Sequence, residues 1–147
     1  MRIEKNAFAA ILAFAVSVIP TIAAGQSFKV VVNERNSTSS MSKQALSRFF
    51  LKQTTTWING MPAIPVDQAA GSEIREAFSQ EIHDRDVKAV KSFWQRQIFS
   101  GRGVPPTEKT SDEEVLVFVQ ANPGAVGYVS VDTELREGVK VLRIADQ

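Results

Sequence analysis

The sequence contains no cysteine and only one histidine, His83, among its 147 residues. Without cysteine the chain has neither thiol catalysis nor a cysteine metal site. In an oxidising compartment its fold would rest on its core and not on disulfides. A metal site usually needs three or four ligands, often several His or Cys. One histidine beside Asp84 and Asp86 is weak support for such a site, so we expect a helix-boundary residue here, and neither a metal nor a cofactor.

The sequence also lacks an excess of charge of one sign, with 17 Lys and Arg against 16 Asp and Glu. The first 24 residues hold two of the basic side chains and one of the acidic ones, so the remainder is formally neutral. Proteins that bind nucleic acid usually show a basic excess or stripe. The composition therefore argues against nucleic acid as a partner.

The N-terminus has the three parts of a secretory signal peptide. Two basic residues precede an almost entirely apolar stretch over residues 7 to 19, and small residues follow up to Ala24. The apolar stretch is shorter than the roughly 20 residues that a membrane-spanning helix needs. We expect a signal peptide over residues 1 to 24 and a single periplasmic domain over residues 25 to 147. After cleavage we expect no insertion into a membrane.

Strand-like and helix-like segments alternate along the rest of the chain. β-branched runs bounded by turn residues predict strands, and Ser or Asp before an apolar period of helical spacing predicts a helix start. Ser111 and Glu114 form a capping box. Helices that cover a small mixed sheet are the natural outcome of such an α/β order. The expected strands are 28–33, 63–66, 125–131 and 139–144, and the expected helices begin near Ser42, Ser72, Asp84 and Ser111.

The turn from Val66 to Arg75 is the first candidate for a binding site. A small-residue loop that opens a helix presents free backbone N–H groups and the positive end of the helix dipole, which suit phosphate, sulfate or carboxylate. Gly71 would let the backbone approach such a ligand, and the Ser72 hydroxyl would donate to it. The alternative is that these two residues only form a turn and a helix cap.

The loop around Arg102 is the second candidate. Arg102 stands between two glycines and is able to form a mobile contact to an anion. The alternative is a solvated surface loop, as Gly- and Pro-rich segments usually are.

The sequence offers no convincing pair of a nucleophile and a base, and no P-loop, nucleophile elbow or dinucleotide fingerprint. The acidic run over residues 112 to 114 is accounted for by its capping box. We therefore expect no catalytic residues and no enzyme.

Three segments resemble the phosphate ABC-transporter substrate-binding proteins. Residues 30 to 57 are similar to a segment of this family. That segment begins with V-V-N, continues with Q-L-x-x-I-F-L-G-K and ends at a Trp. Residues 70 to 78 resemble its G-S-G-T-R-E-A-F phosphate turn, and residues 122 to 129 resemble its P-G-A-I-G-Y-V strand. The resemblance implies one lobe of a type II periplasmic-binding-protein-like fold, a small mixed sheet flanked by helices.

The chain departs from this family in two ways. It corresponds to about one of the two lobes that the family closes over its ligand. Its turn has Glu73 and Ile74 where the family has Gly and Thr, and Glu73 would repel a phosphate dianion. Gln68 stands near the place of an arginine that the family often carries. The resemblance thus implies ligand contacts from Gly71 and Ser72, and Gln68 is a further candidate for such a contact.

Two functions follow as hypotheses. The first is an exported solute-binding lobe for phosphate or another small anion, connected with ABC-type phosphate uptake and completed by a second copy or another protein. The second is a protein-interaction or sensory module, in which the lobe has lost its ligand site and contacts a transporter or envelope protein.

Overall fold

The computed structural model describes residues 25 to 145. The predicted signal peptide therefore lies outside the described residues. The strands are β1 (Phe28–Asn33), β2 (Ser40–Ser42), β3 (Ile64–Gln68), β4 (Thr107–Lys109), β5 (Ala125–Ser130) and β6 (Val139–Ala145). The helices are α1 (Lys43–Phe50), α2 (Glu73–His83), α3 (Val87–Phe99) and α4 (Asp112–Ala121).

The six strands form one mixed sheet in the order β2-β6-β1-β5-β3-β4. β1 pairs antiparallel with both β5 and β6, whereas β3 pairs parallel with β5 and β4. β2 lies parallel to β6 at the other edge. The α/β class expected from the sequence, a small mixed sheet flanked by helices, is confirmed.

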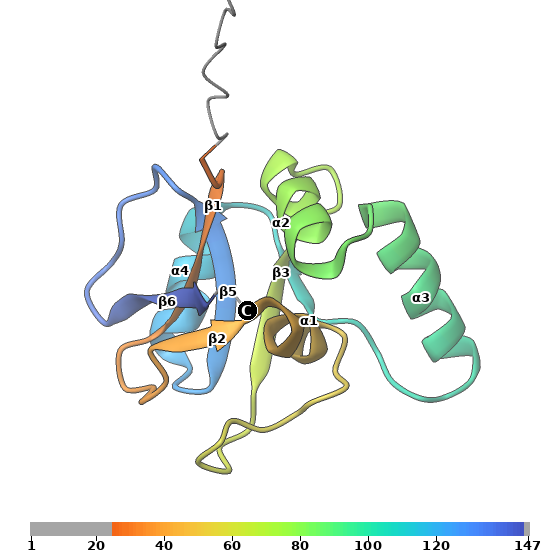
Figure 1. The fold of residues 1–147 in the computed structure, drawn as a ribbon, viewed down its shortest axis with the longest axis horizontal. Coiled ribbons are helices and arrows are strands. Elements are labelled where there is room, and N and C mark those ends of the chain that lie inside the picture. The colour runs from red at the N-terminus through yellow and green to blue at the C-terminus, as the bar shows by residue number, and fades with distance from the viewer. Residues whose placement is uncertain (1–24, 146–147) are drawn as a thin grey trace, which may run out of the picture.

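Helices cover both faces of the sheet (Figure 1). Alternate residues of β1 point to opposite faces, so Phe28, Val30 and Val32 pack with α1 and α2 while Val31 packs under α4. α3 lies outside these layers and packs on α2 and on Leu51, the residue that follows α1. It stands at one side of the molecule in Figure 1.

The predicted start of the third helix at Asp84 is wrong. Asp84 ends α2 in the left-handed region, with φ 52°, which Asp tolerates better than most residues. Asp86 is the N-cap of α3, where its side chain accepts a hydrogen bond from the Ala89 N–H. The N-caps expected at Ser42, Ser72 and Ser111 are confirmed.

Candidate functional site

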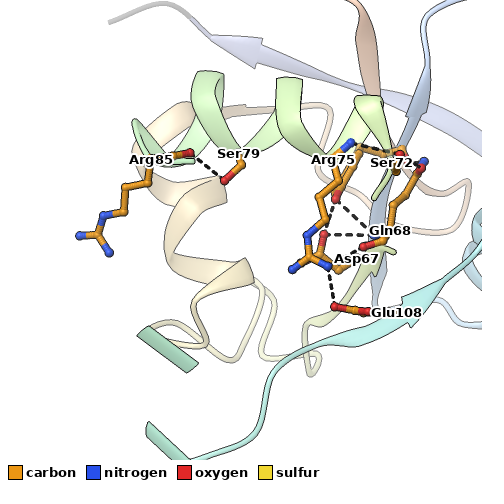
Figure 2. Close-up of polar contacts among 8 residues, drawn as sticks. Asp67, Gln68, Ser72, Arg75, Ser79, Arg85 and Glu108 are labelled. Carbon is orange, nitrogen blue, oxygen red and sulfur yellow. Dashed lines mark hydrogen bonds and ion pairs between the residues drawn. The ribbon is translucent and has the colours of Figure 1, made fainter. Parts of the chain in front are cut away.

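The first candidate site lies where β3 passes into α2. β3 is buried between β5 and β4 and ends at Gln68, and α2 begins after Ser72. The connecting turn brings the Ser72 hydroxyl to 2.7 Å from Gln68 Oε1, to which it donates. The structure therefore brings these two predicted site residues together (Figure 2).

The polar atoms of Gln68 and Ser72 are engaged inside the protein. Ser72 Oγ accepts a hydrogen bond from the Arg75 N–H, which is its capping role. Gln68 is buried, and its amide nitrogen donates to Asp112 Oδ1 at 2.7 Å and to the Tyr128 carbonyl at 3.0 Å. These bonds hold the turn in one conformation.

Arg75 is the central cation of the site, and it points inward. Its side chain is 5% exposed, and its guanidinium donates to the Gln68 carbonyl at 2.6 Å. It forms ion pairs with Glu108 and, at 3.3 Å, with Asp67. Figure 2 shows the guanidinium between these groups. Its positive charge is therefore compensated within the fold.

Burial raises the pKa of the Asp67 carboxyl above its ordinary value, and the Arg75 guanidinium offsets this only in part. Burial and the adjacent Asp67 carboxylate raise the pKa of Tyr128 well above its usual range. Tyr128 stays protonated and donates to Asp67. For Arg75, burial alone would lower the pKa, but its two acidic partners outweigh it and the net shift is upward. Arg75 is thus a permanent cation.

Several backbone N–H groups of this turn remain available to a ligand. Within the described residues, those of Gly71, Glu73 and Ile74 have no hydrogen-bond acceptor. Gly71 is exposed, and a Cβ added there would meet no atom within 4 Å. The start of α2 therefore offers unpaired donors and the positive end of a helix dipole to a small anion.

Arg102, the fourth predicted site residue, is not part of this cluster. It lies in the exposed loop between α3 and β4, where its backbone N–H donates to the Gln97 carbonyl. In Figure 1 this loop follows the end of α3 that lies away from α2. No described interaction joins Arg102 to Gln68 or Ser72.

A second polar site lies between α1 and the end of α2, and sequence reasoning missed it. A hollow of about 600 Å3 is lined there by Ser47, Arg48, His83 and Arg85, among others. Ser47 Oγ lies 2.7 Å from His83 Nδ1. Burial, together with the Arg85 charge, lowers the pKa of His83 to about 4, so the imidazole is neutral at pH 7. Helix spacing alone could not pair residues 36 positions apart.

The other groups considered for chemistry have structural partners. The Asp112 carboxylate accepts from Gln68 and from the Ser130 N–H. The Glu114 carboxylate accepts from the Thr110 N–H, next to the Ser111 cap. Among residues 25 to 145 no group of three or more His, Asp or Glu is placed to hold a metal ion.

The mixed sheet with its flanking helices is the fold of one lobe of a class of solved transport receptors. The solved structures to which the chain is similar belong to that class. An ABC-type phosphate transport receptor from Vibrio cholerae matches with a TM-score of 0.62 at 19% identity, over 80% of this chain and 46% of that one.

Two further matches are of the same kind. A protein assigned as a phosphate ABC-transporter substrate-binding protein from Clostridium perfringens, whose structure contains bound phosphate, has a TM-score of 0.63 at 18% identity and is covered to 44%. PstS from Borrelia burgdorferi has a TM-score of 0.57 at 11% identity and is covered to 47%. Each match takes in 80% of this chain.

The chain thus has the fold of one lobe of these phosphate-binding receptors and spans less than half of their length. The expected resemblance is confirmed at the level of the fold. The neighbours are transport receptors and not enzymes. No family model matches the sequence, and no curated protein matches it.

Proposed function

We propose that this chain is a solute-binding lobe that holds phosphate or a related small anion at the start of α2, in connection with ABC-type phosphate uptake. The observation that carries this proposal is the set of unpaired N–H groups at Gly71, Glu73 and Ile74 beside an open glycine. The Gln68–Ser72 hydrogen bond supports it, because it holds the turn ready for a ligand.

The site has the character of a half-site. Arg75 is neutralised by Asp67 and Glu108, so it adds little attraction. The exposed Glu73 carboxylate, in the first turn of α2, repels a phosphate dianion. Binding by this chain alone would therefore be weak. A second copy of the chain or another protein, such as a transporter subunit, would complete the site.

Calorimetric titration of residues 25 to 147 with phosphate tests this proposal. Gly71→Leu is the sharpest variant, because the new side chain projects into open space at the turn and does not disturb the core. Ser72→Ala is less clean, since it also removes the cap of α2. We expect Gly71→Leu to abolish the binding heat while the thermal midpoint stays unchanged. Equal phosphate binding by the unmodified chain and by Gly71→Leu would exclude this site.

Delivery to the periplasm belongs to the same proposal. The signal-like pattern over residues 1 to 24 motivates it. The protein isolated from the periplasm is expected to begin at Gly25. An intact N-terminus in that fraction, or protein found only in the cytoplasm, would refute it.

The second candidate function is a protein-interaction or sensory module. One observation favours it: Gln68, Ser72 and Arg75 are all bonded within the fold, as expected of a ligand site turned into a structural core. On this view the titration gives no heat with any small anion. A pull-down from periplasmic extract would then recover a specific envelope partner, and a strictly monomeric chain without one would count against the module.

A further inference from the structure

α3 is attached to the rest of the domain along one face only. Val90 and Trp94 pack with Leu51, next to partly buried Phe93. The helix then runs past this contact to its C-terminal end and the following loop, which form an outer corner of the molecule in Figure 1. The last residues of α3 are therefore not covered by the sheet or by another helix.

Apolar side chains gather at this uncovered end. Phe99 is 91% exposed, Val104 63% and Ile98 51%. A large apolar side chain is seldom left in water to this degree, and exposed apolar side chains that lie together mark a contact surface. We call the set Ile98, Phe99 and Val104, with flanking Arg96 and Arg102, the α3 tip.

The charged side chains of α3 and of the loop that follows it are all positive. Between Asp86 and Glu108 the sequence has four cations and no acidic residue. The four cations are Lys88, Lys91, Arg96 and Arg102. Within the described residues none of them has an ion pair or a side-chain hydrogen bond, and all are exposed.

Part of this charge lies on the same helix face as the exposed aromatic ring. Lys88, Lys91 and Phe99 are spaced by three and eight residues, which places them along one side of α3. Residues 25 to 147 are neutral as a whole, so this concentration of cations is local. Exposed apolar side chains with cations beside them form the pattern of a surface that contacts an anionic lipid interface.

We propose that the α3 tip docks this protein on an anionic phospholipid surface. Phe99 and its apolar neighbours enter the boundary between headgroups and acyl chains, and Arg96 and Arg102 contact lipid phosphates. The contact is peripheral. No helix among residues 25 to 145 is long and apolar enough to cross a bilayer.

The shape of the tip favours a lipid surface over a protein. A stable protein interface needs a broad patch of about 800 Å2 on each partner. The α3 tip instead offers only three apolar side chains, two at the end of α3 and one directly after the Gly-Arg-Gly segment. A bilayer accepts such a projection, because lipids rearrange around an inserted side chain.

Vesicle co-sedimentation tests the proposal. The protein is the chain from Gly25 onward, which contains every described helix and strand. One set of vesicles contains equal parts of phosphatidylcholine and phosphatidylglycerol, and the other contains phosphatidylcholine alone. We expect binding to the anionic vesicles only, and we expect added salt to weaken it.

Two substitutions and two matched controls locate the contact. Phe99→Ser is expected to lower the partition coefficient about tenfold, and the double variant Arg96→Gln/Arg102→Gln about 25-fold, at about fivefold per cation. Ile58→Ser removes an apolar side chain that is 99% exposed in another loop. Arg35→Gln removes an exposed cation elsewhere. Both controls are expected to bind like the unmodified chain.

Three results would overturn the proposal. The first is no binding to anionic vesicles, and the second is equal binding to both kinds of vesicle. The third is a loss of binding in Ile58→Ser as large as that in Phe99→Ser. Self-association that Phe99→Ser abolishes, without vesicle binding, would assign the tip to a contact between copies. None of these results depends on phosphate, so the test is independent of the solute-binding proposal.

Discussion

Acidification is expected to destabilise this domain through His83. The pKa of His83 is lowered from 6.5 to about 4, first by burial and then by the charges of Arg85 and Arg75, with Asp84 opposing. Its ring packs edge-on to Phe50 and Phe78. The folded state therefore resists the proton that the unfolded chain accepts.

The sign and size of the effect follow from this shift. Above about pH 6.5 the imidazole is neutral in both states, and it has no linkage effect on stability. As the pH falls from 6.5 toward 4, only the unfolded state binds the proton, so the free energy of unfolding decreases. A shift of about 2.5 pH units at about 1.4 kcal/mol each gives a total loss of about 3 kcal/mol.

Urea denaturation at a series of pH values measures this loss. His83→Gln is the control, since an amide keeps a polar partner for Ser47 but does not titrate in this range. Asp67 is present in both proteins, so its own response to acid cancels in the comparison. From pH 7 to pH 4 we expect the unfolding free energy of the unmodified protein to fall by about 3 kcal/mol more than that of His83→Gln. Parallel curves would refute the reasoning.

Three other substitutions have defined outcomes. Glu73→Gln is expected to tighten phosphate binding about threefold by calorimetry, because it removes a like charge from the turn; unchanged affinity would contradict this. Gly124→Ala is expected to lose about 3 kcal/mol in urea denaturation, since its Cβ would lie 2.1 Å from the Pro62 carbonyl oxygen; a neutral effect would show that the backbone yields. Arg75→Met is expected to lose about 3 kcal/mol at neutral pH by leaving Asp67 buried without its ion pair. That loss is expected to decrease in acid, where Asp67 takes up a proton, and a pH-independent loss would argue against this cause.

The long elements of the fold could be predicted because their signals are local. The β-branched run of β1 and the Ser111 cap of α4 are properties of adjacent residues, and both appear as expected. β2 and β4 could not be predicted in this way. Each has three residues and exists through pairing with β6 or β3, which are distant in the sequence.

Pro65 shows how strand pairing determines whether a proline is tolerated inside a sheet. Proline suits an edge or a strand end, yet β3 is an interior strand. The pairing of β3 with β4 starts only at Val66, so Pro65 lies ahead of it and its missing N–H is not needed there.

The candidate site was predicted in part. Gly and Ser at the start of a helix identify a turn with free N–H groups, and Ser72 is the N-cap of α2. The role of Arg75 was missed because arginine is mostly found exposed, whereas the buried face of α2 includes Arg75, Phe78 and Ile82. The sequence signal was present as the spacing of these three residues. The partner Glu108 comes from β4, whose position only the sheet reveals.

The most direct test of the solute-binding proposal is the response of backbone amides to phosphate in a nuclear magnetic resonance titration of residues 25 to 147. We expect saturable shifts at Gly71, Glu73 and Ile74, whose N–H groups are unpaired, and no such shifts in Gly71→Leu. Chloride at the same ionic strength is the control. Amides at the start of α2 that do not respond to phosphate, or that respond equally to chloride, would contradict the proposal that this lobe holds a small anion.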